Sequence, residues 1–101
     1  MTKCMNNTKW NEIRLAMYNI PYTIKWRTKD FENGYISQWD GDWFYHFASG
    51  VYKNIEWLEI QFTSETKELI INKLKEIKVP AEQLENSVKI FGYKDGFIDY
   101  L

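Results

Sequence analysis

The sequence predicts an α+β fold, a mainly antiparallel sheet of about four to six strands with two helices packed on one face. Two segments, 8–20 and 63–78, repeat apolar residues at spacings of three and four, which is typical of amphipathic helices. The segments between and after them are rich in β-branched and aromatic residues and are separated by turn residues, as strands are. The order is helix, three or four strands, helix, and one or two strands.

The length of 101 residues predicts a single domain over 1–101, in which residues 1–6 form a flexible N-terminus. A chain of this size buries about two-thirds of its surface on folding, so its core needs neither a metal nor a disulfide. Cys4 is the single cysteine, which excludes an intrachain disulfide.

The first helix is expected over 8–20. Its apolar residues share one stripe and are Trp10, Ile13, Met17 and Ile20. Asn7 or Thr8 can cap the first amides. Pro21 ends the helix, because the residue before a proline avoids the α region.

Residues 22–27 then alternate as a half-buried strand does, with Tyr22, Ile24 and Trp26 on one side. The polar stretch 28–34 contains Asn33-Gly34 and is expected to be a turn or short loop.

The next element is predicted as a β-hairpin in which runs 34–39 and 43–47 flank Asp40-Gly41. An Asp-Gly pair between β-prone runs indicates a type I′ turn, which needs positive φ at both positions. One face would carry Ile36, Trp43, Tyr45 and Phe47, and the other Tyr35, Trp39, Phe44 and His46. Both faces are therefore aromatic. Rings on the side away from the helices must meet a loop, a second subunit or a ligand.

A connection over 48–54 leads to a fourth strand, 55–62. The second helix follows over 63–78, capped by Thr63 or Ser64 and ended at Val79-Pro80. Its buried face is expected to consist of Leu69, Ile70, Leu74 and Ile77. A turn at 85–87, a strand at 88–93 and a turn at 95–96 complete the chain.

No catalytic residue, metal ligand set or cofactor motif is expected. A histidine on a strand between aromatics, as His46 would be, is more often structural than catalytic. Asp40 and Asp42 resemble a carboxylate pair, but turn chemistry explains Asp-Gly-Asp more simply. Glu56 and Glu59 would lie on opposite faces of one strand and so cannot act together.

Charge and hydropathy limit the partners. A net charge of −1 gives no general attraction to nucleic acid. The acids Asp30 and Glu32 offset part of the positive charge of Lys25, Arg27 and Lys29, so nucleic-acid binding is not expected. The N-terminus lacks the apolar run of a signal peptide, and no segment reaches the roughly 20 apolar residues that span a bilayer. A cytoplasmic location and no membrane partner are expected.

Five motifs resemble, in this order, a bacterial family of small proteins of unknown function: MNNTKWNE, RTKD, GYISQWDGDWFYHF, IEWLEI and VKIFGY. The resemblance covers nearly the whole chain from about residue 5. It implies a small bacterial protein and makes Met5 an alternative start to Met1. It implies no activity and no catalytic residues.

Two functions follow as hypotheses. The first is a protein-binding domain, such as a toxin-neutralising immunity protein or an inhibitor, whose partner has a basic surface or is a second copy. Its expected binding residues are Tyr35, Trp39, Asp40, Asp42, Phe44 and His46. The second is a small enzyme or ligand-binding domain with a cleft around His46, Asp40, Asp42 and Tyr45. In a third and simpler interpretation, these rings only fill the core.

Overall fold

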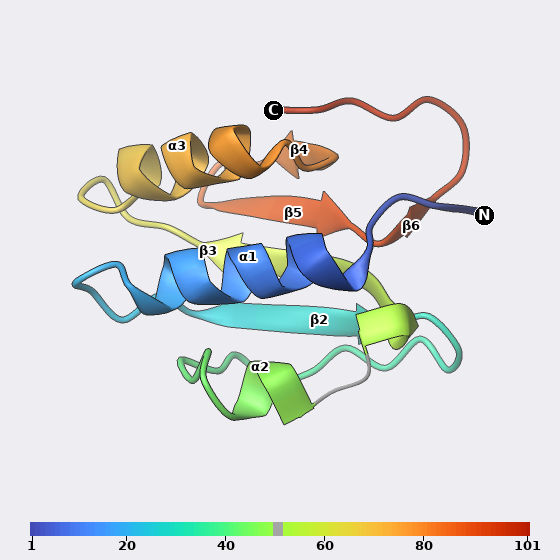
Figure 1. The fold of residues 1–101 in the computed structure, drawn as a ribbon, viewed down its shortest axis with the longest axis horizontal. Coiled ribbons are helices and arrows are strands. Elements are labelled where there is room, and N and C mark those ends of the chain that lie inside the picture. The colour runs from blue at the N-terminus through green and yellow to red at the C-terminus, as the bar shows by residue number, and fades with distance from the viewer. Residues whose placement is uncertain (50–51) are drawn as a thin grey trace.

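The computed structural model describes residues 1–49 and 52–101, without the side chain of Ser49. In chain order its elements are β1 (Thr2–Lys3), α1 (Asn7–Tyr18), β2 (Trp26–Asp30), α2 (His46–Ser49), the 3₁₀ turn η1 (Tyr52–Asn54), β3 (Ile55–Gln61), α3 (Lys67–Ile77), β4 (Ala81–Gln83), β5 (Ser87–Phe91) and β6 (Tyr93–Lys94). The main sheet is antiparallel and has the order β2-β3-β5-β4, while β1 and β6 form a second, two-stranded sheet (Figure 1). The α+β prediction is confirmed.

The two long helices cover one face of the main sheet (Figure 1). Alternate residues of the central strands point toward them and are fully buried, such as Leu58 on β3 and Ile90 on β5. They join Ile13 of α1 and Leu74 of α3 in one apolar cluster. Burying these side chains removes apolar surface from water, which is the main force holding the helices on the sheet.

α1 lies where the sequence predicts it and presents the expected stripe. Trp10, Ile13 and Met17 are buried. The cap is Asn6 rather than Asn7 or Thr8, because the Asn6 side-chain oxygen accepts the Lys9 N–H at 2.8 Å.

The prediction for the next strand is wrong in its position. β2 runs from Trp26 to Asp30, so it starts later than expected and continues into the stretch predicted as a loop. Charged residues join this strand because β3 offers them partners: Arg27 Nε lies 2.9 Å from Glu59, and Lys29 Nζ lies 3.2 Å from Glu56. The turn at Asn33-Gly34 is confirmed, with Gly34 at φ +74°.

The hairpin predicted at Asp40-Gly41 is also wrong. Residues 35–40 run back along the outer edge of β2, with bridges Lys29↔Ile36 and Trp26↔Asp40, so the reversal occurs at Asn33-Gly34 instead. Residues 43–45 then form a turn that leads into α2. Gly41 does not have the positive φ that a type I′ turn would require.

Aspartate side chains explain this local structure. Asp40 Oδ1 accepts the Asp42 N–H at 2.7 Å, and Asp42 Oδ1 accepts the N–H groups of Phe44 and Tyr45 at 2.9 Å each. Asp42 therefore caps a helical turn, and the chain after it cannot continue as a strand.

β3 matches its prediction, and α3 does so with two corrections. Neither Thr63 nor Ser64 is its cap; the helix begins at Lys67, after a turn in which the Thr66 hydroxyl accepts the Thr63 N–H at 2.9 Å. Leu69 was expected to be buried but is 43% exposed, because the buried face is centred on Ile70, Ile71 and Leu74.

Both ends of the chain are paired. Thr2 and Lys3, expected to be flexible, form β1 opposite β6, and the N–H of Leu101 bonds to the Val79 carbonyl. β4 was not predicted. The predicted connection 48–54 includes residues 50 and 51, which lie outside the described residues. None of the helices in the described ranges is long and apolar enough to cross a membrane.

Candidate functional site

Residues 30–46, which we call the acidic segment, combine exposed rings with an excess of acids. The segment contains four acids, no lysine and no arginine: Asp30, Glu32, Asp40 and Asp42. Six exposed large hydrophobic residues also belong to it: Phe31, Tyr35, Ile36, Trp39, Phe44 and Tyr45. An exposed apolar surface rimmed by charge marks a site of interaction more often than a site of packing.

Three of the predicted site residues come together at the end of this segment. His46 Nδ1 lies 2.7 Å from Asp40 Oδ2, and His46 Nε2 lies 3.8 Å from Asp42 Oδ2. The hydrogen bond to Asp40, followed by the charges of Asp40 and Asp42, raises the pKa of the His46 imidazole above its ordinary value. His46 begins α2 and is exposed, whereas the sequence predicted a strand position for it.

Asp42 has a structural task in addition to its charge. The hydrogen bond that its carboxylate accepts from the Tyr45 N–H is the main reason why the pKa of Asp42 is lowered. The charge of His46 and the hydrogen bonds from the Phe44 and His46 amides lower it further. The carboxylate is thus held ionised and fixed in direction. This confirms the turn-chemistry interpretation of Asp-Gly-Asp.

The buried ring of Trp43 anchors the acidic segment to the core. Trp43 donates its indole N–H to the Ile24 carbonyl at 2.8 Å, and its ring packs on Phe47 and Trp26 at centroid distances of 5.0 and 5.8 Å. Arg14 of α1 donates to the Trp43 and Phe44 carbonyls from the other side. The segment is consequently rigid at its C-terminal end.

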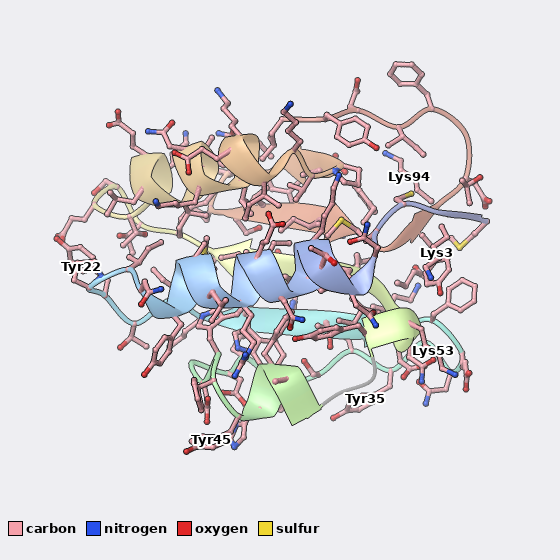
Figure 2. All side chains as sticks on the ribbon, in the orientation of Figure 1. Lys3, Tyr22, Tyr35, Tyr45, Lys53 and Lys94 are labelled. Carbon is pink, nitrogen blue, oxygen red and sulfur yellow. The ribbon has the colours of Figure 1, made fainter. Side chains whose placement is uncertain are left out.

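The other predicted rings point in different directions. Tyr35 and Tyr45 are 63% and 70% exposed and project from the edge of the molecule beside α2 (Figure 2). Phe44 lies under the Arg14 guanidinium at 4.7 Å, and Trp39 lies under that of Arg27 at 4.6 Å. The two-faced arrangement expected for a hairpin is therefore wrong.

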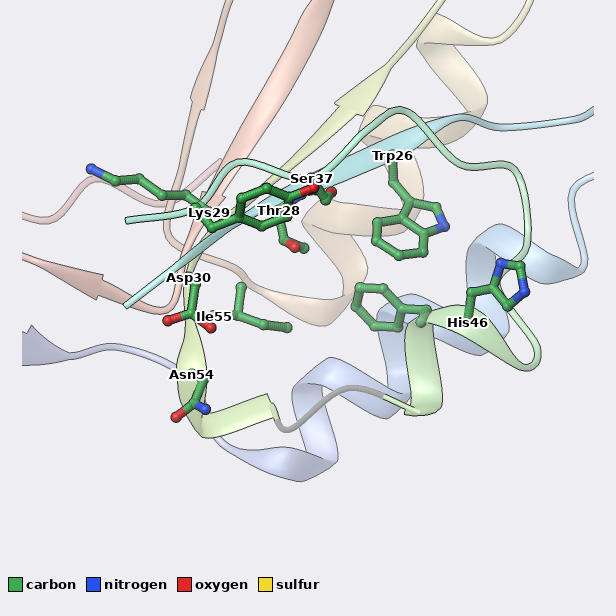
Figure 3. Close-up of a pocket in the computed structure, with 10 residues that line it drawn as sticks. Trp26, Thr28, Lys29, Asp30, Ser37, His46, Asn54 and Ile55 are labelled. Carbon is green, nitrogen blue, oxygen red and sulfur yellow. Dashed lines mark hydrogen bonds between the residues drawn. The ribbon is translucent and has the colours of Figure 1, made fainter. Parts of the chain in front are cut away.

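A cavity of about 420 Å³ lies between β2 and α2. Its lining consists of Trp26, Thr28, Lys29, Asp30, Tyr35, Ser37, His46, Phe47, Asn54 and Ile55. Figure 3 shows His46 at one end of this lining and Asp30 with Asn54 at the other. The cavity does not bring His46, Asp40 and Asp42 together over one space. Within the described ranges, no three histidine, cysteine or acidic side chains are grouped to hold a metal ion.

A family model matches residues 1–96, which is nearly the whole chain. The chain belongs to the family of unknown function DUF6678. No curated protein and no solved structure matches it.

Sequence reasoning missed four members of the acidic segment: Asp30, Phe31, Glu32 and Ile36. The Asn33-Gly34 turn was the signal that could have found them, because a hairpin closed there places Ile36 beside Lys29. It also missed Arg14, whose guanidinium bonds to two carbonyls distant in sequence.

Proposed function

We propose that this chain is a small bacterial protein that binds another protein through the acidic segment, in the manner of a toxin-neutralising immunity protein or an inhibitor. The observation that carries the proposal is the presence of exposed rings among four acids that no lysine or arginine of the segment balances. Acids steer a basic partner toward the surface, and aromatic side chains supply affinity once water is excluded.

The rigidity of the segment supports the same proposal. Trp43 is bonded to the core, and Asp42 fixes the turn before α2. Binding therefore orders little backbone, and tyrosines such as Tyr45 lose few rotamers on contact. The lone Cys4, which needs no oxidising compartment, agrees with a cytoplasmic site of action.

The test compares capture of a partner from the native host by four variants. Asp40 and Asp42 are unsuitable targets because each also holds the backbone. Tyr45→Ala and Glu32→Lys change side chains that hold none of the hydrogen bonds described above. Phe97→Ala and Glu85→Lys are the matching changes, from an aromatic residue to alanine and from glutamate to lysine, at exposed positions elsewhere.

We expect a partner with a basic surface that is captured by the wild type and both controls and lost from the two segment variants. Melting temperatures should stay close to the wild type, since surface substitutions change stability by about 0.5 kcal/mol at most. Equal loss from the control variants, or a partner with an acidic surface, would contradict the proposal.

A ligand-binding domain is a second candidate, favoured by the cavity between β2 and α2. Its volume of about 420 Å³ lies in the range of small-molecule sites, which runs from about 300 to 1,000 Å³. A compound that raises the melting temperature of the wild type but not of Tyr35→Ala would support this candidate. A compound that stabilises both equally would not.

A further inference from the structure

The face of the main sheet that points away from α1 and α3 carries aromatic rings covered by cations. We call it the far face. The sheet register defines it: Arg27, Glu59 and Lys89 lie opposite one another across three strands, and Lys29, Trp57 and Phe91 form the next row. Residues directly opposite in antiparallel strands point to the same side. These side chains therefore point away from the helices, whereas Leu58 and Ile90 point toward them.

Trp57 is the most informative of them. It is only 9% exposed, yet it does not belong to the apolar cluster that contains the other buried hydrophobic residues of the described chain. Instead, the ammonium group of Lys89 lies over its ring, 4.3 Å from the centroid. A lysine side chain therefore lies over this ring, on the face of the sheet away from the helices.

Phe91 repeats this arrangement on the neighbouring strand. It pairs directly with Trp57, and the ammonium group of Lys94 lies 4.4 Å from its ring centroid. At the outer edge of β2, the Arg27 guanidinium lies 4.6 Å from the Trp39 ring. Three rings, each with its own cation, are therefore spread across the sheet.

The charge of this face differs from that of the chain as a whole. Lys25, which precedes β2, continues the alternation of Arg27 and Lys29. Three carboxylates meet the cations of this face: Glu59, Glu82, which pairs with Lys89 across the two strands, and Glu56, which lies 3.2 Å from Lys29. Glu59 is neutralised by Arg27 at 2.9 Å and accepts the Ser87 hydroxyl at 2.7 Å. Lys89, Lys94 and Lys25 remain available for an anion, in a chain whose net charge is −1.

We propose that the far face binds single-stranded nucleic acid. Bases stack on Trp57, Phe91 and Trp39, and the lysines that now cover the two central rings move aside to contact phosphates. Lysine suits this exchange because its charge sits on a flexible stem. Base stacking on aromatic side chains combined with a cationic surface is the usual way in which proteins hold single strands.

The strand must be single rather than paired. A duplex hides its bases, and reading it requires a helix or a two-stranded ribbon that enters a groove. The far face offers a sheet with rings on its two central strands instead, and only unpaired bases can lie on those rings. The expectation against nucleic acid rested on net charge and on the acids Asp30 and Glu32 that follow the cations of residues 25–29. Neither observation reveals how the register gathers cations on one side of the sheet.

The first test measures binding of a fluorescent oligothymidylate of about ten nucleotides by anisotropy at low salt. We expect Trp57→Leu and Phe91→Leu each to weaken binding roughly tenfold, and Lys89→Glu to weaken it further. Lys75→Glu makes the same charge change on α3, at an exposed position on the helix side, and should have little effect. The logarithm of the affinity should fall with the logarithm of salt by about 0.7 for each phosphate contacted.

A second measurement, on the wild type, does not depend on any variant folding. The chain has five tryptophans. We expect the indole N–H resonances of Trp39 and Trp57 to shift when the oligonucleotide is added. Those of Trp26 and Trp43, which bond to the Asp42 and Ile24 carbonyls, should stay in place.

Four results would overturn the proposal: no binding at low salt, equal affinity for a duplex, equal weakening by Lys75→Glu, or indole shifts confined to Trp26 and Trp43. Self-association of the wild type that Lys89→Glu abolishes would assign the far face to a second copy of the chain, and this would also overturn it.

Discussion

Two aromatic surfaces of this small protein differ in charge and in how their rings are covered. In the acidic segment, Tyr35 and Tyr45 stand in solvent beside carboxylates. On the far face, Trp57 and Phe91 lie beneath lysines. Trp39 stands between the two, because it belongs to the acidic segment by sequence and to the far face by its contact with Arg27.

The difference shows that the net charge of a chain describes neither of its surfaces. An overall charge of −1 conceals one region without a lysine or arginine and another on which cations outnumber acids. The two surfaces adjoin at Trp39, where the acidic segment runs along the edge of β2. A charged partner is therefore attracted by one surface and repelled by the other.

The largest effect should come from the residue that joins the acidic segment to the core. Trp43→Ala removes a buried ring and its bond to the Ile24 carbonyl, and we expect it to cost about 3–5 kcal/mol of unfolding free energy. Chemical denaturation measures this, with Tyr45→Ala as the exposed control. Similar denaturation midpoints for the two variants would mean that the segment is not anchored as described.

A medium effect is expected on the far face. Ser87→Ala deprives the buried Glu59 carboxylate of its 2.7 Å hydrogen bond, which should cost about 1–3 kcal/mol. Ser64→Ala, at an exposed position before α3, is the matched control and should change little. If both serines prove equally dispensable, the polar groups of the far face do not hold the sheet together.

Trp39→Leu tests the border between the surfaces. Loss of the contact with Arg27 should cost about 0.5–1 kcal/mol, the usual contribution of an exposed cation–π pair. We expect this variant to weaken oligonucleotide binding while it still captures the protein partner. If the variant instead kept oligonucleotide binding and lost the protein partner, Trp39 would belong to the acidic segment's binding surface. The far face would then offer two rings, Trp57 and Phe91.

The smallest effect is a pH dependence of the acidic segment. The raised pKa of His46 means that its charged form is favoured by folding, through Asp40 first and then Asp42. This contribution is fully present below the ordinary value of 6.5 and is lost as the pH rises through the raised pKa. The melting temperature of the wild type should therefore exceed that of His46→Gln at about pH 5 and approach it at about pH 9. A difference of the same size at both pH values would show that His46 acts by packing alone.

Sequence reasoning succeeded where a strong local pattern extends over many residues. The helix at 67–77 buries one side against the core, as its periodicity predicted. The strand at 55–61 was found from its content of Ile, Trp and Phe, although residues on both of its sides are buried. Sequence reasoning failed at 43–47, because Trp43 and Phe47 are four apart and fit both an alternating strand and one helical turn. The helical turn forms because the Asp42 carboxylate accepts the N–H groups of Phe44 and Tyr45. The sequence alone does not show which amides this carboxylate binds.

The candidate sites were predictable to different degrees. The residues between Tyr35 and His46 are close in sequence and were recognised, although their directions were wrong, whereas residues 30–32 were not recognised. The far face was not recognised, because Trp57 and Phe91 meet only through the register of β3 and β5. Pairing between distant strands depends on the whole fold, and no local pattern reveals it.

The pairing of the C-terminus beside Val79 has a practical consequence. Residue 101 lies against Val79, whereas the acidic segment ends at α2 on the opposite side of the view in Figure 1. The N-terminal strand β1 instead pairs with β6, whose Tyr93 stacks on Phe31 of the acidic segment. A fusion partner or surface tether at the C-terminus therefore emerges away from Tyr35 and Tyr45. The protein can be immobilised by that terminus with its acidic segment turned toward the solution.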